Sequence, residues 1–418
     1  MNKTILTNTK EKKQTSVINH IVLVFLMYML FFRQVYSYLG MPYVTTKKGS
    51  FVYEQASLSS SITMFLSVVA VFCIFLLFFN TRFYAEGTYL IISLVLIAGV
   101  CLWSFFAVKE VGLGNLLYSS MPPHVYITAL MFCIGMREEL FKVFLKHAKI
   151  LGILSILACI ITSVLFFNSH SGAVLADSSV LRYYIQGFWL ICICSFSEEK
   201  SNKAFVYPCI MFFAVMSFSF SSRSWLIQSI IWLIVYTYFS QKNRSVLRLI
   251  KTIIIALVLI GIIYVFMKNF FPDLMKILIE KMSPKDTRAL QYADLFAQTD
   301  LSDFIIGNGY SFTYNSSIQG GEYNYIDNAY LLMLVRYGLL IGITYPLMFF
   351  VPAVKARFSK HTMPIIMWLM ALGGLSIFCA TIFDLKSIAL PVAAGHCMHL
   401  ASHKRKQLSE EGNDSDNE

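Results

Sequence analysis

The chain has 418 residues, of which 57% are hydrophobic and only 14% are charged, and its mean hydropathy is +0.64. A soluble globular domain is about 45–50% apolar and about 25% charged, so this chain holds more apolar surface than a water-soluble fold of its size can bury. The composition excludes a disordered, fibrous or disulfide-stapled protein and predicts an all-α, polytopic integral membrane protein.

A net charge of +11 is typical of proteins that bind nucleic acid. The basic residues, however, stand in short runs between apolar segments and not in one cluster, so we expect a lipid bilayer and no nucleic acid. All nine cysteines also lie in apolar segments. A disulfide framework or a zinc site places cysteines in polar segments at characteristic spacings, so we expect neither, and no cofactor.

The apolar runs predict about twelve transmembrane helices in a single membrane domain over residues 1–418. They lie at residues 17–33, 59–79, 88–108, 123–136, 150–167, 182–196, 203–220, 225–240, 249–267, 327–354, 363–382 and 386–401. An even number of spans places both termini on one side. Of the 34 Lys and Arg residues, 21 fall in segments on that side and 12 on the other, which predicts that both termini are cytoplasmic.

Three segments outside the spans have a composition of their own. Residues 1–16 are expected to form a cytoplasmic N-terminal tail, and the first span reads as a retained signal anchor because no small-residue cleavage site follows it. Residues 137–149 place apolar side chains and cations at helical spacing, which predicts an amphipathic helix on the inner membrane surface. Residues 402–418 are rich in acidic residues towards the end, and we expect a disordered cytoplasmic tail.

The external segment 268–326 is far longer than the other loops, and long ordered loops are usually functional. Ser283-Pro284 predicts the start of a surface helix, and Gly307-Asn308-Gly309 ends its pattern. The tyrosines from Tyr310 to Tyr325 are interleaved with Asn and Gln. Such a stretch suits sugar faces and hydroxyl groups, or alternatively an aromatic belt at the membrane interface.

Three arginines stand out by position. Arg223 lies in a tight external turn, Arg288 lies on the helix predicted in the long loop, and Arg336 lies within the tenth span. An arginine within a membrane is expected to face a cavity or a counter-ion. The alternatives are a snorkelling residue for Arg223, a solvated helix face for Arg288, and a structural ion pair for Arg336, for example with Asp384.

The segment from Asp327 to Gly342 resembles a signature of the O-antigen polymerase and O-antigen ligase superfamily of membrane glycosyltransferases. It shares an opening Asp-Asn, a following Tyr-Leu, and a Gly-x-x-x-Gly at the start of a span. Upstream, Arg288 followed by Gly307-Asn308-Gly309 is similar to the family's arginine and Gly-x-Gly loop, and Phe220 to Ser224 is similar to its Ser-Arg turn. The motif resemblance covers residues 180–355. Asp327 stands where ligases of the superfamily carry a His, which favours a polymerase over a ligase.

The resemblance implies a GT-C-like fold with a large external loop and an enzyme that polymerises lipid-linked oligosaccharide repeat units of O-antigen or capsular polysaccharide. Glycan would pass from undecaprenyl pyrophosphate to the next lipid-linked repeat at the outer face of the bacterial cytoplasmic (inner) membrane. A chain-length regulator protein is a further expected partner. The alternatives are an O-antigen ligase and a repeat-unit transporter or flippase.

The resemblance and the chemistry together give Arg223, Arg288 and Asp327 as catalytic candidates. Fixed guanidinium groups stabilise the charge that grows on the departing pyrophosphate, and a carboxylate accepts or orients the proton of the attacking hydroxyl. The alternative role of Asp327 is a helix N-cap. The candidate substrate-binding residues are Tyr310, Glu322, Asn328, Tyr330 and Arg336. Gly338 and Gly342 are expected to let helices pack closely.

Overall fold

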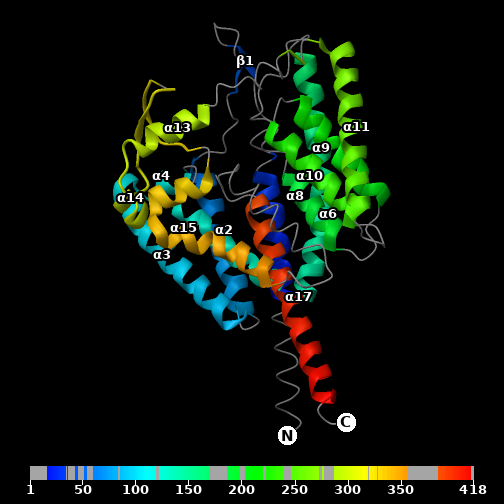
Figure 1. Ribbon diagram of the computed structural model, residues 1–418. Helices are drawn as coiled ribbons and strands as arrows, with labels where there is room; N and C mark the ends of the chain where they lie inside the picture. Colours follow the sequence, from blue (N-terminus) through cyan, green and yellow to red (C-terminus); the bar gives the residue numbers. More distant parts are fainter. Residues whose placement is uncertain are drawn as a thin grey trace. The chain divides into compact units, whose positions relative to one another are not determined.

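The computed structural model describes two compact units, each of which is treated by itself (Figure 1). The first comprises Met1–Phe32, Leu58–His147 and Thr287–Glu418, and the second comprises Arg33–Ser57 and Ala148–Asp286. The described residues are 17–33, 35, 43–45, 51–53, 60–82, 85–118, 122–169, 186–197, 203–219, 223–239, 246–272, 275–276, 287–318, 320–326, 328–355 and 385–415. Within them, the secondary structure is helical apart from two short antiparallel strand pairs.

By length and composition alone, five helices among these residues are long and apolar enough to cross a membrane. They are Ser61–Thr81, Gly87–Val111, Glu138–Ile161, Ile253–Phe270 and Ala329–Pro352. Shorter apolar helices lie at Val17–Arg33, Pro123–Gly135, Lys203–Ser217 and Leu226–Tyr238. These helices support the multi-pass membrane protein that the composition predicts. The expected span at 363–382 lies outside the described residues.

The first unit holds most of the described helices and the part of the long loop that begins at Thr287. Its elements are α2 (Ser60–Thr81), α3 (Gly87–Val111), α4 (Leu113–Tyr118), η2 (Pro123–Met131), α5 (Phe132–Gly135), the beginning of α6 (Glu138–Ser169), α13 (Thr287–Phe296), α14 (Leu301–Ile306), β3 (Tyr314–Ser316), β4 (Gly321–Tyr323), α15 (Ala329–Lys355) and α17 (Leu385–Ser415). Every residue of η2 and α5 is buried. Their 3₁₀ and α-helical turns together rise only about 24 Å, which is less than the hydrocarbon thickness. The span expected at 123–136 is therefore a buried core segment of this unit.

The helix expected on the inner membrane surface at 137–149 packs against protein instead. It is continuous with the span that follows it, in the single helix α6. Leu140, Phe141 and Phe144 are buried, and the ring of Phe141 stacks on His396 of α17 at 3.9 Å between centroids. The apolar face that predicted a lipid contact is thus satisfied by another helix of the same unit. The pattern of residues cannot tell these two apolar surroundings apart.

Helix α17 continues through the stretch that was expected to be a disordered tail. It runs from Leu385 to Ser415, so residues 402–415 extend the helix of the expected last span. Near its start, α17 lies so close to α5 that a methyl group on Gly395 would clash with the carbonyl oxygen of Phe132. Figure 1 shows the C-terminal part of this helix in red, extending towards the C-terminus.

The second unit contains the rest of α6 with α8 (Gln186–Ser197), α9 (Lys203–Ser219), α10 (Arg223–Phe239), α11 (Val246–Phe270) and the strand pair β1 (Tyr43–Thr45) and β2 (Phe51–Tyr53). Aromatic rings hold α8, α9 and α10 together. Phe188 lies 4.7 Å from Trp232 and 5.2 Å from Phe213 between ring centroids, and Trp232 donates a hydrogen bond from Nε1 to Ser195 Oγ at 3.3 Å. Apolar side chains along α11 are exposed, as expected of a helix that faces lipid.

Candidate functional site

The expected tenth span is broken and folded back on itself at Gly338. This residue has φ 65° and ψ −165°, a conformation that is essentially restricted to glycine. A straight helix would separate Tyr330 from Phe350 by about 30 Å, whereas their rings stack at 6.4 Å. A methyl group on Gly342 would also lie 3.2 Å from the Cα atom of Leu334. We call residues 329–337 the first arm and residues 339–355 the second arm of α15, which Figure 1 shows as two stretches at an angle to each other.

The second arm runs antiparallel to α3. Tyr337 and Gly338 at the break lie level with Trp103, which contacts the Tyr337 ring at 5.9 Å between centroids. At the other end, Lys355 Nζ lies 2.5 Å from the carboxylate of Glu86. The second arm therefore follows most of the length of α3, whereas the first arm, about 13 Å long, is too short to cross a bilayer. The continuous span expected at 327–354 is wrong in this respect, because hydropathy does not report a reversal at one glycine.

Three carbonyl groups lose their helical partners at the break, and all three are bonded by groups from elsewhere. Asn308 N donates to Val335 O at 2.8 Å, and Gly309 N donates to Arg336 O at 2.9 Å. Trp103 Nε1 donates to Tyr337 O at 2.9 Å. An unbonded carbonyl in an apolar environment costs several kcal/mol, so these donors make the break stable within a membrane.

The donors Asn308 and Gly309 belong to the Gly-x-Gly loop, which docks on the break through backbone contacts. Gly307 has φ 93°, and a methyl group there would lie 2.6 Å from Gly338 N and 2.8 Å from Arg336 O. Only glycine permits this approach. Two of the three motif segments that carry the family resemblance, 307–309 and 327–342, are therefore in contact at residues 307–309 and 335–338.

Arg336 is the charged group at the centre of this junction. Its side chain is only 5% exposed, and its NH2 group donates to Asn324 O at 2.6 Å. The guanidinium carbon also lies 5.4 Å from the centre of the Tyr310 ring, within range of a cation–π contact. Its Nε has no hydrogen-bond partner within the described part of the chain. Arg336 thus holds both ends of the segment 310–324, and the expected ion pair with Asp384 lies outside the described residues.

Glu110, at the end of α3, secures the other side of the same loop. One oxygen of its carboxylate accepts hydrogen bonds from Ser311 N at 3.2 Å and from Ser311 Oγ at 3.0 Å. The other oxygen, Oε1, packs closely against Gly309, because a methyl group on Gly309 would lie only 2.8 Å from it. Sequence reasoning missed Glu110. An acidic residue in the last turn of an otherwise apolar span, directly after Lys109, was the signal that could have indicated it.

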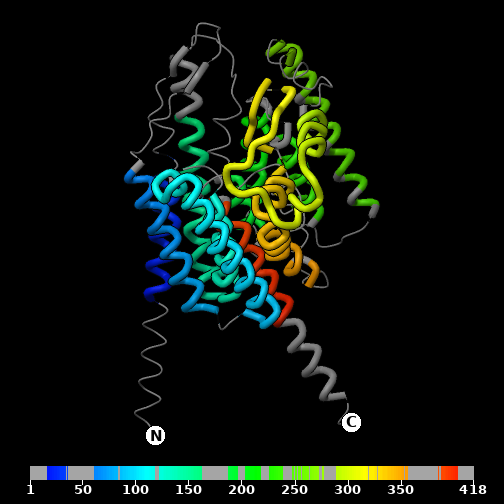
Figure 2. Tube along the Cα trace, turned by 90° about the vertical axis from the view of Figure 1, so that its left-hand side faces the viewer, coloured from blue at the N-terminus to red at the C-terminus, as the bar shows by residue number. Residues whose placement is uncertain are grey.

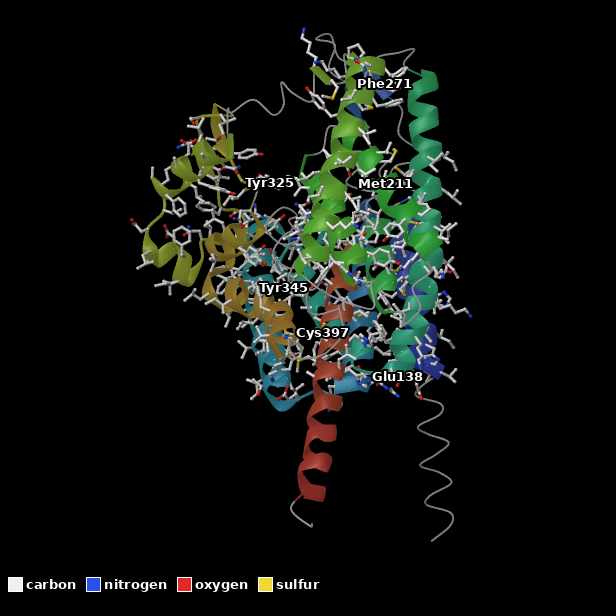
Figure 3. The ribbon with its side chains drawn as sticks, turned by 45° about the vertical axis from the view of Figure 1, so that its right-hand side comes forward. Glu138, Met211, Phe271, Tyr325, Tyr345 and Cys397 are labelled. Carbon is white, nitrogen blue, oxygen red and sulfur yellow. The ribbon has the colours of Figure 1, made fainter. Side chains whose placement is uncertain are left out.

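The tyrosine-rich stretch forms a small hairpin that packs on α13. Strands β3 and β4 are antiparallel, with Tyr314 opposite Tyr323. Tyr314 is buried and its hydroxyl donates to Tyr325 O at 3.0 Å, and Gln291 of α13 donates to the same carbonyl at 2.9 Å. Figure 2 shows this yellow segment beside the orange α15, and Figure 3 labels Tyr325 on the stretch that leads into α15. Tyr314 has a structural role, whereas Tyr310, Tyr323 and Tyr325 are partly exposed.

The other binding candidates divide between exposed and structural positions. Asn328 caps α15, because its Oδ1 accepts from Tyr330 N at 3.0 Å and from Leu331 N at 3.3 Å. The capping role considered for Asp327 is thus filled by its neighbour. Glu322 is exposed on β4, and Tyr330 is partly exposed on the first arm. The structure therefore brings Tyr310 and Arg336 together, leaves Glu322 on the hairpin surface, and uses Asn328 as a helix cap.

The three catalytic candidates lie outside the described side chains. Asp327 lies outside the described residues altogether. Arg288 belongs to α13 in the first unit, and Arg223 is the first residue of α10 in the second unit. The predicted start of a helix at Ser283-Pro284 also lies outside the described residues, and α13 begins at Thr287.

The described part of the site is a loop that is held against α15 by hydrogen bonds and by Arg336. It offers a buried guanidinium, aromatic rings and backbone groups, and no group of three or more His, Cys, Asp or Glu side chains gathers anywhere in the described ranges. No protein-family model, curated protein or solved structure matches the chain. The family resemblance therefore rests on the motifs given above.

Proposed function

We propose that the chain is a membrane glycosyltransferase that polymerises oligosaccharide repeats carried on undecaprenyl pyrophosphate. The observation that carries this proposal is the docking of the Gly-x-Gly loop on the broken helix, since it joins two of the motifs on which the resemblance depends. The motif order and the multi-pass character give further support. O-antigen or capsular polysaccharide is the product class.

The proposed reaction needs an acceptor hydroxyl, a base and a stabilised leaving group. The hydroxyl oxygen of the incoming lipid-linked repeat attacks the anomeric carbon of the growing chain. The bond from that carbon to the pyrophosphate oxygen breaks, and undecaprenyl pyrophosphate leaves with the electron pair. Asp327 accepts the hydroxyl proton, and Arg223 and Arg288 bind the pyrophosphate, whose negative charge increases as the bond breaks.

Arg336 has a positioning role in this proposal. It bonds to Asn324, three residues before Asp327, and it contacts Tyr310 at the start of the hairpin segment. By holding these two points, it fixes the path of the chain that leads to Asp327 and Asn328. Tyr310, Glu322 and Tyr330 then supply partly exposed or exposed groups for sugar hydroxyls and ring faces.

The proposed placement is in the bacterial cytoplasmic membrane, with about twelve transmembrane helices and both termini in the cytoplasm. The excess of Lys and Arg on the side of the termini supports this orientation. The segment 268–326 then lies on the outer face, where lipid-linked repeats are joined. A chain-length regulator would bind from the same face.

The broken helix α15 also favours a second candidate, a transporter of lipid-linked repeats. Transporters often bind substrates or ions at broken helices through freed backbone groups. In this chain, however, the carbonyls of residues 335–337 are already bonded to Asn308, Gly309 and Trp103. This occupancy favours the polymerase over the transporter.

The deciding experiment supplies purified protein in liposomes with fluorescent undecaprenyl-pyrophosphate-linked repeats. A polymerase produces a ladder of longer glycans in the outer leaflet, and no repeat crosses the bilayer. A transporter carries repeats across without lengthening them. Asp327→Asn should abolish the ladder, and Glu139→Gln, which changes an exposed carboxylate on α6 outside the proposed site, is the matched control. A full ladder with Asp327→Asn would contradict the proposed base.

A further inference from the structure

The short helix α14 exposes an apolar face that the described residues of its unit leave uncovered. Leu301 is 76% exposed, Ile305 50% and Ile306 70%, although all three are large aliphatic residues. Phe296 at the end of α13 is also exposed, and its ring lies 5.8 Å from that of Phe304 on α14. Contiguous exposed apolar residues of this size indicate a contact surface.

The level of this face is fixed by the break in α15. The carbonyls of Ile305 and Ile306 lie against Gly338, where any added methyl group would clash with them. Gly338 in turn follows Tyr337, whose carbonyl is bonded to Trp103 of α3. The C-terminal end of α14 therefore lies at the level of Trp103. Trp103 belongs to α3, which is long and apolar enough to cross a membrane.

That level falls inside the apolar part of α3. The first charged residue after Trp103 in α3 is Lys109. It follows six residues later, which is about 9 Å along the helix. Around this level, Leu102, Phe105 and Phe106 of α3 are exposed, as are Leu339 and Leu340 directly after the break. The exposed face of α14 thus lies at the same level as these side chains, which face lipid if α3 crosses the bilayer.

We propose that α14 is embedded in the membrane, with Leu301, Ile305 and Ile306 in contact with the acyl chains of the bilayer leaflet next to the α3 C-terminus. The long loop would then enter the hydrocarbon beside the first arm of α15 and leave it through the Gly-x-Gly loop. The backbone of that loop is bonded to α15, which meets the requirement that non-helical backbone at this depth be satisfied by protein. The proposal does not depend on glycan transfer.

Nitroxide labels on the full-length protein in phosphatidylethanolamine and phosphatidylglycerol vesicles test this directly. Ile305 and Ile306 are each replaced by a single cysteine. The background protein carries Cys101→Ser, because the native Cys101 is exposed and would otherwise be labelled. Collision rates are measured with oxygen, which concentrates in lipid, and with a water-soluble nickel chelate. Leu102→Cys on α3 is the lipid control, and Glu322→Cys on β4 is the aqueous control. Leu301→Cys is the alternative probe if either isoleucine variant loses its elution profile.

The expected ratio of oxygen to nickel collisions at residues 305 and 306 is several-fold above that at residue 322 and similar to that at residue 102. A ratio like that of residue 322 would place α14 in water and overturn the proposal. Low collision rates with both reagents would mean that protein covers this face, which overturns it equally.

Discussion

Gly307 and Gly338 meet backbone to backbone, so that a methyl group on Gly307 would lie 2.6 Å from Gly338 N. This contact joins the Gly-x-Gly loop to the interior of the apolar helix α15. It depends on two glycines that lie 31 positions apart in the chain, and it determines where the loop, the two arms of α15 and the end of α3 come together.

Gly338→Ala should strongly destabilise the first unit. Alanine at this φ and ψ costs about 1–3 kcal/mol, and its methyl group would also clash with the carbonyls of residues 305 and 306. The effect is measured as a lower unfolding temperature in detergent, with the loss of the monodisperse elution peak on heating as the signal. Gly261→Ala is the matched control, because Gly261 lies inside α11 with open space around its Cα, and it should be neutral or slightly stabilising.

Arg336→Gln should loosen the hairpin segment while leaving the rest of the unit folded. The variant loses the contact with Tyr310 and the charged hydrogen bond to Asn324 O. The hydrogen bond alone is worth about 1.5–3 kcal/mol. Hydrogen exchange at residues 308–326 should accelerate, whereas α2 should be unaffected. Unchanged exchange in that segment would show that Arg336 does not hold it.

Glu110 and Ser311 should be energetically coupled. Glu110→Ala and Ser311→Ala each remove the hydrogen bond from Ser311 Oγ to the Glu110 carboxylate, so the double variant should lose less stability than the sum of the two single changes. Because both side chains are exposed, we expect a coupling of only about 1 kcal/mol. Additive losses of unfolding temperature would exclude the contact in solution.

Glu86 and Lys355 allow a charge-swap test of the antiparallel register of α3 and the second arm. Glu86→Lys should cost up to about 1 kcal/mol, since the pair is partly exposed, and adding Lys355→Glu should recover most of it. High salt should reduce the difference between the variants. If the double change is no more stable than Glu86→Lys alone, the two ends are not adjacent.

Asn328→Ala and Asp327→Asn separate capping from catalysis. Removing the Asn328 cap should lower stability by about 0.5–2 kcal/mol, with elongation per folded molecule largely retained. Asp327→Asn should keep the unfolding temperature and lose elongation. The paired thermal and ladder assays distinguish the two outcomes, and the reverse pattern would assign the cap to Asp327.

Hydropathy alone predicted the helices whose surroundings are uniformly apolar. The spans expected at 59–79 and 88–108 agree with α2 and α3 within a few residues, because a run of some 20 apolar residues leaves few other options. The same signal failed at 327–354, where the reversal depends on the backbone angles of Gly338 and on donors from residues 308 and 309. Such long-range partners are not encoded in any local window of sequence.

The candidate site was predicted only as a set of segments. The resemblance named 307–309 and 327–342, and the structure joins them, but it gave no reason to expect that Arg336 would bond to Asn324. Asn328 stays a substrate-binding candidate, and its amide oxygen also caps α15. Glu110 was missed because its role depends on the tertiary approach of Ser311, 201 positions later in the chain.

The reversal at Gly338 has a consequence for biosynthesis. The insertion machinery meets a largely apolar stretch of 24 residues that by length alone could enter the bilayer as one straight helix. The donors that stabilise the turn, Asn308, Gly309 and Trp103, all precede this stretch and have already been synthesised when it emerges. The nascent chain therefore already contains the donors for the reversal when this stretch emerges, and a chain that ends at residue 355 and has been released from the ribosome should be able to form it.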